Sequence, residues 1–252
     1  MREFLKTENL TRRFEDKDKT VFAAVDKVSF TLYEGETLGI VGESGCGKST
    51  LVKLITGLRY ADSGKILLDG QDITRARGKK LREVYRQMQM VFQSPVSSFD
   101  PRKTVGYGIS ESLRNNGVTK AERLKRTAEL LEKCGLSAEY AARYPHEMSG
   151  GECQRAAIAR ALAIEPKILI CDEATSALDV TVQQQIMELL QSLKREKKLS
   201  FLFICHNLAL VQSFCDRVIV MQDGKIAEEG TPEEIINSPK SEYTKRLIDA
   251  AF

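Results

Sequence analysis

The sequence predicts an α/β fold with a parallel sheet covered by helices on both faces. Two continuous apolar stretches, KILICDEA at 167–174 and SFLFICH at 200–206, are typical of strands buried on both sides. A helical stretch at 181–198 separates them, and this alternation favours a parallel sheet. Between about 110 and 165, apolar residues recur at helical spacing, which indicates a mainly helical insertion.

The N-terminal part is predicted to be richer in strands. Residues 1–40 contain short β-like runs such as VSFTL at 28–32, which precedes a turn at Glu34-Gly35-Glu36. Residues 51–58 are expected to form a helix that ends at Gly57. The strand expected at 65–68 is followed by Asp69-Gly70, a strong hairpin signal, and a charged helix is expected around 78–87. Near the other end, residues 216–226 are expected to form a hairpin that turns at Asp223-Gly224.

Composition places the 252-residue chain among globular proteins, with 42% apolar and 29% charged residues. Its net charge of +3 is too balanced to indicate nucleic acid as a partner. The six cysteines are scattered without a CxxC pair, which disfavours a zinc site or a disulfide framework. No apolar run approaches the roughly 18 residues that span a bilayer, and the charged first residues do not resemble a signal peptide. We therefore expect a chain that stays in the cytosol and reaches a membrane only by docking on other subunits.

The stretch GESGCGKST at 42–50 fits the phosphate-loop pattern G-x-x-x-x-G-K-[ST], between an expected strand and an expected helix. Glycines let backbone N–H groups approach phosphate oxygens, and the helix adds its N-terminal partial positive charge. Lys48 is expected on the β- and γ-phosphates, and the Ser49 hydroxyl on Mg²⁺. A glycine-rich turn that binds nothing is the alternative. The predicted nucleotide-binding residues of the loop are Gly42, Glu43, Ser44, Gly45, Cys46, Gly47, Lys48, Ser49 and Thr50.

Two carboxylates follow the apolar strand in ILICDEATSALD at 168–179. Asp172 is placed to orient the shell of a Mg²⁺ ion, and Glu173 to take a proton from an attacking water or to orient it. Acidic residues at a helix N-terminus are the plainer explanation, because the helix dipole favours them anyway. Next to a phosphate loop, the pair favours nucleotide hydrolysis. An ordinary GTPase also requires an Asn-Lys-x-Asp motif, which this sequence does not contain.

A second helix start able to bind an anion is predicted at Ser149-Gly150-Gly151, in MSGGECQRAAIARAL. Ser149 and Glu152 also fit the capping box S-x-x-E, so the segment has a purely structural explanation too. One nucleotide needs one phosphate loop. The surplus anion site is therefore expected to complete the site of a second subunit.

Together these motifs resemble those of ABC-transporter ATP-binding subunits, over essentially the whole chain. The ordered set is the phosphate loop, VFQSP at 91–95, SGGECQR at 149–155, CDEATSALD at 171–179 and ICH at 204–206. The longer stretches VGESGCGKST, VFQSPVSSFDPR, YPHEMSGGE and SALDV look like the dipeptide/oligopeptide/nickel importer subfamily. The resemblance implies a P-loop NTPase with a RecA-like core, in one ATP-binding domain over 1–252. It also implies an antiparallel β subdomain and a helical subdomain inserted at about 95–160.

The resemblance also implies residue roles, with ATP and Mg²⁺ as cofactors and hydrolysis to ADP and phosphate as the reaction. Gln93 is expected to touch Mg²⁺ or water and to sense the transporter groove, and Glu173 to be the catalytic base. His206 is expected at the γ-phosphate. Ser149, Gly150 and Gly151 are expected to cap the partner's ATP, and Asp179 to cross the dimer interface. The metal ligands implied are Ser49, Gln93 and Asp172.

The sequence departs from the family pattern at three places. Glu152 stands where the family often has an amide, so it either points away or weakens ATP binding. Cys153 replaces a residue that is often basic. The aromatic residue that stacks on adenine is assigned to Phe14, with Phe22 as the rival. The chain also ends at Phe252 without the cysteine-containing tail of some peptide-importer subunits, which favours nickel-type or metallophore-type members.

The resemblance implies a peripheral subunit on the cytoplasmic face of the cell membrane. Its expected partners are two integral-membrane permeases, a second ABC ATPase in a hetero- or homodimer, and, indirectly, an extracytoplasmic binding protein for peptides, nickel or metal chelates. A non-transport ABC ATPase, an exporter subunit and a P-loop domain that does not hydrolyse ATP are the alternatives. Translation types usually carry two such domains, chromosome types carry long coiled coils and exporter domains are often fused to membrane helices, none of which the sequence contains. Separately, Cys46 lies beside Lys48 near a helix start, a setting that lowers a thiol pKa, so its alkylation is expected to block ATPase activity.

Overall fold

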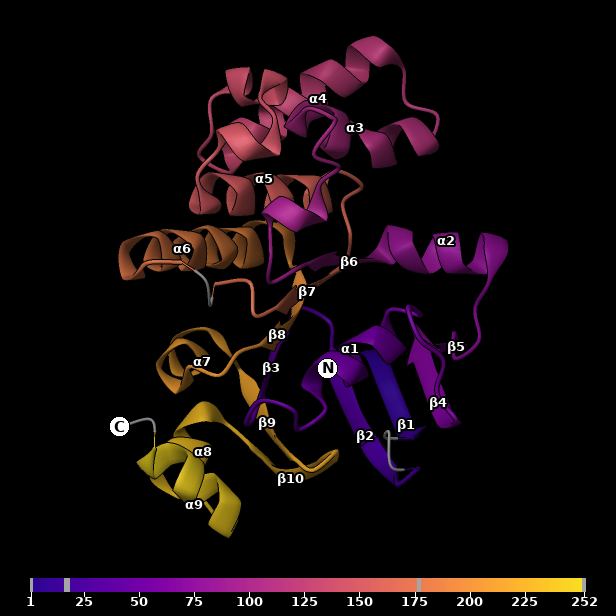
Figure 1. The fold of residues 1–252 in the computed structure, drawn as a ribbon, viewed down its shortest axis with the longest axis vertical. Helices are drawn as coiled ribbons and strands as arrows, with labels where there is room; N and C mark the ends of the chain where they lie inside the picture. Colours follow the sequence, from indigo (N-terminus) through magenta and orange to yellow (C-terminus); the bar gives the residue numbers. More distant parts are fainter. Residues whose placement is uncertain (1, 16–18, 176–177, 251–252) are drawn as a thin grey trace.

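The computed structural model describes residues 2–15, 19–175 and 178–250. Within these residues the strands form a six-stranded and a four-stranded sheet (Figure 1). In the larger sheet β10 pairs antiparallel with β9, and the other neighbours run parallel. Its order is β10 (Lys225–Gly230), β9 (Arg217–Gln222), β3 (Thr37–Val41), β8 (Ser200–Ile204), β7 (Ile168–Asp172) and β6 (Met88–Val91). The predicted α/β class with a parallel sheet is confirmed.

Alternate residues of the central strands pack into different hydrophobic clusters. In β7, Ile168 and Ile170 belong to the cluster shared with the four-stranded sheet, whereas Leu169 and Cys171 belong to the cluster on the other face. All four are fully buried. Because successive side chains of a strand point to opposite faces, a strand covered on both sides must be apolar throughout. This is why β7 and β8 could be identified from sequence.

The four-stranded sheet is antiparallel, in the order β2 (Val21–Tyr33), β1 (Glu3–Glu15), β4 (Ser63–Leu68) and β5 (Gln71–Asp72). The short runs expected over 1–40 were wrong in length, because β1 and β2 each span 13 residues. Register shifts interrupt their pairing, and Asn9 and Lys27 have positive φ angles of 46° and 51°. Such bulges break the strict alternation by which long strands are recognised. The hairpin turn at Asp69-Gly70 is confirmed between β4 and β5.

Helices cover both sheets and extend the molecule at one end (Figure 1). The helices α1 (Lys48–Ile55) and α2 (Gly78–Gln87) follow the expected positions, as does α6 (Val180–Lys197). The helices of the expected insertion are α3 (Val105–Asn115), α4 (Lys120–Lys133) and α5 (Gly150–Leu162). In Figure 1, α3 and α4 lie beyond α5, farthest from the four-stranded sheet. Across the described ranges, no helix combines the length and apolar character that crossing a bilayer requires.

Three C-terminal helices were not anticipated: α7 (Leu208–Phe214), α8 (Pro232–Asn237) and α9 (Glu242–Asp249). A signal for α8 exists, because Thr231 and Glu234 form a capping box with Pro232 at the first helical position. The helix α9 carries no comparably strong signal. It packs against β10, which is separated by β9 from β3, the strand that leads to the phosphate loop.

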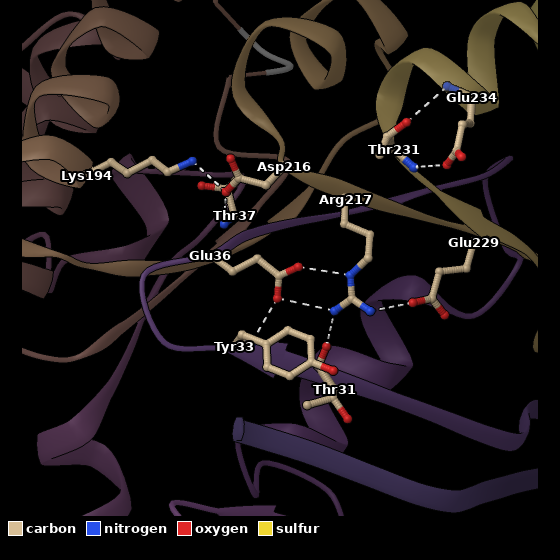
Figure 2. Close-up of polar contacts among 10 residues, drawn as sticks. All are labelled: Thr31, Tyr33, Glu36, Thr37, Lys194, Asp216, Arg217, Glu229, Thr231 and Glu234. Carbon is tan, nitrogen blue, oxygen red and sulfur yellow. Dashed lines mark hydrogen bonds and ion pairs between the residues drawn. The ribbon is translucent and has the colours of Figure 1, made fainter. Parts of the chain in front are cut away.

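An ion-pair network joins the two sheets at the edge opposite the site. Figure 2 shows Arg217, at the start of β9, with its guanidinium on Glu36, which precedes β3. The two Arg217–Glu36 hydrogen bonds measure 2.9 and 3.2 Å, and Glu36 also accepts from the backbone N–H of Tyr33 at 2.8 Å. Arg217 contacts Glu229 and the backbone carbonyl of Thr31 as well. The network therefore links β2, β3, β9 and β10 where these strands begin or end.

Candidate functional site

The candidate site lies at the carboxyl ends of parallel strands. Strand register places Ile40 of β3 and Asp172 of β7 level with the same residue of β8, Ile204. The phosphate loop begins two residues after Ile40, and His206 lies two residues after Ile204. On the far side of β7, β6 ends at Val91, two residues before Gln93. In open α/β sheets, ligands bind in the crevice beyond the carboxyl ends of the strands.

Two glycines let the phosphate loop pass close to other backbone segments. A Cβ on Gly47, whose φ is 112°, would lie 2.1 Å from the carbonyl oxygen of Ala24 in β2. A Cβ on Gly42, whose φ is 148°, would lie 2.3 Å from the carbonyl oxygen of Met221 in β9. Any side chain there would clash and would also require a strained backbone. The loop is therefore shaped by contacts with both sheets.

Lys48 is the first residue of α1 and is only 5% exposed. Its ammonium group donates hydrogen bonds to the carbonyl oxygens of Gly42 at 2.7 Å and of Glu43 at 2.8 Å. The charge is thus held over the loop. Gly47, the N-cap of α1, has no side chain that could accept from the first N–H groups of the helix, so these groups are suited to bind an anion.

The loop faces a hollow of about 240 Å³ on the side of the four-stranded sheet. Both candidate aromatics border it, with their ring centroids 6.0 Å apart. Phe22 is 50% exposed, whereas the guanidiniums of Arg12 and Arg59 lie 5.0 and 5.5 Å from the centroid of Phe14. The residues that line the hollow are Phe14, Phe22, Ala24, Ser44, Gly45, Gly47, Lys48, Ser49, Thr50 and Glu173.

Asp172, the last residue of β7, has an unsatisfied oxygen. Its Oδ1 atom is buried and has no hydrogen-bond partner among the described residues. Burial raises the pKa of this carboxyl, the charge of Glu173 raises it further, and Lys53 and Lys48 oppose the shift. A buried carboxylate oxygen without a donor is costly unless something binds it, and a hard divalent cation is a suitable ligand.

Glu173 has a backbone conformation that is rare for its residue type. Its φ angle is 49°, and its N–H donates to the carbonyl of Ile204 at 3.0 Å. Strain of this kind costs about 1–3 kcal/mol and is concentrated at functional sites. The bent backbone turns the side chain toward the loop that follows β6, where Gln93 Nε2 donates to Glu173 Oε2 at 2.8 Å. Residues 80 positions apart in the chain are thus in direct contact.

His206 follows β8 and is exposed. Its strand neighbours β7, which carries Asp172 and Glu173, and β3, which leads into the phosphate loop. His206 is nevertheless not among the described residues that line the hollow. The structure therefore places it on the same edge of the sheet, but not among the described residues that border the hollow.

The segment 149–151 belongs to a different surface. Ser149 caps α5 and also forms the expected capping box, with Glu152 Oε2 accepting from the Ser149 N–H at 2.8 Å. A Cβ on Gly151 would lie 2.5 Å from Val182, so this helix start packs on the start of α6. Asp179 caps α6 by accepting from the N–H of Val182 at 3.0 Å. None of these residues lines the hollow in the described part of the chain, and Ser176 and Ala177 of the SALDV stretch lie outside the described residues.

Glu152 and Cys153, the two residues of 149–155 that depart from the family pattern, both form contacts with neighbouring residues. Glu152 is turned back, since Oε1 accepts from the Tyr140 hydroxyl at 2.5 Å while Oε2 binds the Ser149 N–H. The Tyr140 hydrogen bond, followed by the one from Ser149, lowers the pKa of Glu152. Cys153 is fully buried and its thiol donates to the Pro145 carbonyl at 3.3 Å, so a long basic side chain would not fit there.

Two residues of the loop point away from the hollow. Glu43 is not among the described residues that line it, and borders a second hollow on the opposite side of the loop. Cys46 borders this second hollow too, but is only 7% exposed, with Sγ 3.7 Å from Lys48 Nζ. The thiol therefore offers little surface to an alkylating reagent.

The sequence model of the family described as ABC transporter matches residues 25–176. This chain belongs to the ABC transporter family. It is therefore an ABC-type ATPase. The fold agrees, because the dimeric post-hydrolysis structure of the ATP-binding cassette MJ0796 with ADP and Pi superposes with a TM-score of 0.83. That match is 30% identical and covers 90% of this chain and 98% of the other.

Curated relatives of this ABC protein include oligopeptide transport ATP-binding proteins named OppF. The one from Salmonella typhimurium is 48% identical over 229 residues, which cover 90% of this chain and 69% of that protein. The one from Bacillus subtilis is 47% identical over 249 residues, covering 98% and 81%. A glutathione import ATP-binding protein, GsiA of Pectobacterium atrosepticum, is 48% identical over 228 residues, which are 90% of this chain but 37% of that longer protein.

Proposed function

We propose that this ABC protein is the ATP-hydrolysing subunit of an importer for peptides. The observation that carries the cargo class is its 47–48% identity to oligopeptide and glutathione import subunits. The relatives described above are named for peptide substrates. Their names thus favour peptides over the nickel or metal-chelate cargo that the sequence left open.

The chemistry proposed for the site begins with ATP. The adenine base stacks against the Phe14/Phe22 pair, and the phosphates lie on the N–H groups of the loop and the start of α1. Lys48 exchanges its two loop carbonyls for phosphate oxygens. Phe22 is half exposed, so its ring is available without displacing either arginine that lies over Phe14.

A Mg²⁺ ion fits the donors on this edge of the sheet. Asp172 supplies a buried oxygen that has no partner among the described residues, and Ser49 supplies a hydroxyl at the loop. Gln93 lies on the same side of the site, because its side chain is hydrogen-bonded to Glu173. The described residues contain no group of three or more His, Cys, Asp or Glu side chains able to hold a metal alone. That agrees with Mg²⁺, which is usually bound by one or two carboxylates together with substrate phosphates and water. When bound, the ion neutralises charge that develops on the phosphates.

Glu173 is proposed to accept a proton from the attacking water, with Gln93 orienting its carboxylate. The 2.8 Å hydrogen bond from Gln93 supports this arrangement, since it fixes the direction in which the Glu173 carboxylate points. His206 reaches the γ-phosphate from the adjacent strand end in the closed state. Glu173 and His206 are thereby placed to respond when another subunit binds at the loop after β6.

A second cassette is proposed to complete the site. Ser149, Gly150 and Gly151 form the start of α5 and lie outside the chain's own hollow. The Ser149 N–H is bound by Glu152, so the N–H groups proposed to meet an anion are those of Gly150 and Gly151. In a head-to-tail pair, with either a second copy or a related ATPase, they cap the partner's ATP. Asp179 lies beside them at the start of α6 and is placed for the interface. ATP closes the pair and hydrolysis opens it.

The transporter context is tested by purifying the tagged chain from gently solubilised native membranes and identifying its companions by mass spectrometry. We expect two permeases, a second ABC ATPase and an extracytoplasmic peptide-binding protein, which would place the chain on the cytoplasmic face of the membrane. Adding the binding protein with peptide should raise ATP hydrolysis by the complex. Ribosomal or DNA-bound companions, or no membrane companion at all, would contradict the importer.

A further inference from the structure

The phosphate loop borders two hollows. On one side is the hollow bordered by Lys48 and Ser49, and on the other is a second hollow of about 390 Å³. This second hollow lies between the loop and α9, and Glu43 and Tyr243 both border it. A helix near the end of the chain thus lies directly behind the loop.

The contact is a hydrogen bond between a buried hydroxyl and the loop backbone. The N–H of Glu43 donates to Tyr243 Oη at 3.0 Å, and the Tyr243 side chain is only 7% exposed. That N–H belongs to the peptide unit whose carbonyl, on Gly42, accepts from Lys48 Nζ at 2.7 Å. The Gly42–Glu43 peptide is therefore bound at its carbonyl by Lys48 and at its N–H by Tyr243.

The position of Tyr243 is itself fixed. Glu228 in β10 accepts from the backbone N–H groups of Lys240 at 2.9 Å and Ser241 at 3.0 Å, just before α9. Ser241 caps α9 by accepting from the N–H of Tyr243 at 3.2 Å. Because β10 pairs with β9, and β9 with β3, the helix is tied to the strand that leads into the loop.

We propose that Tyr243 is a positioning residue for ATP, whose hydroxyl fixes the Gly42–Glu43 peptide and so aligns Lys48 and the loop N–H groups with the phosphates. This inference rests on the proposed role of the loop in binding ATP. Without the hydroxyl, the Glu43 N–H loses its hydrogen bond to α9 and the peptide is freer to rotate. Lys48 then loses the fixed carbonyls that hold it over the loop in the absence of nucleotide.

The test compares Tyr243→Phe with the wild-type chain in the purified transporter complex. The substitution keeps the ring and removes one hydrogen bond, so the dissociation constant for ATP should rise by about 3- to 10-fold. The KM for ATP should rise with it while kcat changes less, and amide hydrogen exchange should speed up at 43–47. Tyr60→Phe is the matched control, because that hydroxyl belongs to a partly exposed side chain outside the hollow.

Three results decide between the possibilities. Unchanged ATP affinity and unchanged exchange in Tyr243→Phe would overturn the inference. A loss of affinity that only accompanies a general fall in melting temperature would also overturn it, since that marks a packing role. Lys48→Ala separates the two proposals: if that variant keeps wild-type ATP affinity, the proposed function fails, whereas its loss of affinity beside an unaltered Tyr243→Phe rejects only Tyr243.

Discussion

Asp172 and Glu173 are neighbours in sequence but have different surroundings. The Oδ1 atom of Asp172 is buried and has no hydrogen-bond partner among the described residues, whereas Glu173 accepts a hydrogen bond from Gln93. Two adjacent carboxylates in unlike environments can take different tasks, one binding a cation and the other handling a proton. The sequence predicted both residues and both tasks. It could not predict the left-handed backbone of Glu173, which depends on the contact with β8.

Replacing Asp172 by Asn should stabilise the nucleotide-free chain. The change removes a buried negative charge beside Glu173, and we expect a gain of about 1 kcal/mol, or about 2–4 °C in melting temperature. The same variant should lose the extra stabilisation that Mg²⁺ gives to the ATP-bound wild-type chain. Thermal unfolding with ATP alone and with ATP plus Mg²⁺ measures both effects. A variant that is less stable without nucleotide would show that the carboxylate has a structural role.

Other residues show where sequence reasoning stops. Glu43 is part of the phosphate-loop pattern, yet it faces α9 rather than the hollow. Asp179 was assigned to a dimer interface by resemblance, and the structure adds a second role as the cap of α6. Nothing in the sequence pointed to Tyr243, because its contact with Glu43 spans 200 positions. Local patterns identify residue types, but they do not give the direction in which each one points.

At the scale of elements, the strands and helices of the site were predictable because they are strongly patterned. The apolar runs of β7 and β8 and the glycine-rich loop before α1 each carry their own signal. The strands β1 and β2 were underestimated because bulges interrupt their alternation. The helix α9 was missed because it has eight residues, and its attachment depends on Glu228 in another element.

The attachment of α9 predicts a pH-dependent effect of Glu228→Gln. Burial raises the pKa of Glu228, but hydrogen bonds, including those from the Lys240 and Ser241 N–H groups, outweigh it and leave the pKa below its usual 4.5. A carboxyl with a lowered pKa in the folded state contributes stability above its unfolded pKa and loses it as the pH falls through the folded value. At pH 7 the variant should therefore be less stable by about 1 kcal/mol.

The difference between variant and wild type should begin to shrink below about pH 4.5, where the Glu228 carboxyl becomes protonated in the unfolded state, and should be lost once the pH has fallen through the lower folded-state pKa. Urea unfolding at a series of pH values gives the comparison. Glu132→Gln, at an exposed position of α4, serves as a control for changes in net charge. A difference that stays constant down to acid pH would contradict the assigned hydrogen bonds.

At the scale of the whole molecule, the Arg217 network ties both sheets together at the edge opposite the site (Figure 2). Glu36 is 8% exposed, so Arg217→Met would leave a buried carboxylate without its cation. Breaking such a pair costs about 3–5 kcal/mol, and because Arg217 is 23% exposed we expect the lower end of this range. The double variant Arg217→Met with Glu36→Gln should recover part of the loss. Equal losses in the single and double variants, measured by urea unfolding, would show that the charge on Glu36 is not the cause.

The global arrangement separates two groups of predicted site residues. The hollow with Lys48 and Glu173 lies at the sheet, whereas Ser149–Gly151 lies where α5 meets α6. From the surplus of anion-binding helix starts, the sequence predicts that Ser149–Gly151 serves the site of a second subunit, and this stays a prediction. Whether the proposed second ATPase is another copy or a related chain could not be predicted from the sequence, because the surfaces that select a partner leave no local pattern.

The most direct test of the proposed site is Glu173→Gln in the purified transporter complex, with ATP binding and ATP hydrolysis measured side by side. The account predicts that ATP binds as in the wild type, because Gln keeps the shape of Glu173 while the loop and Lys48 are untouched. Hydrolysis should fall by about 100-fold or more, because the amide cannot take a proton from water. Hydrolysis at the wild-type rate in Glu173→Gln would contradict the central claim that Glu173 activates the water.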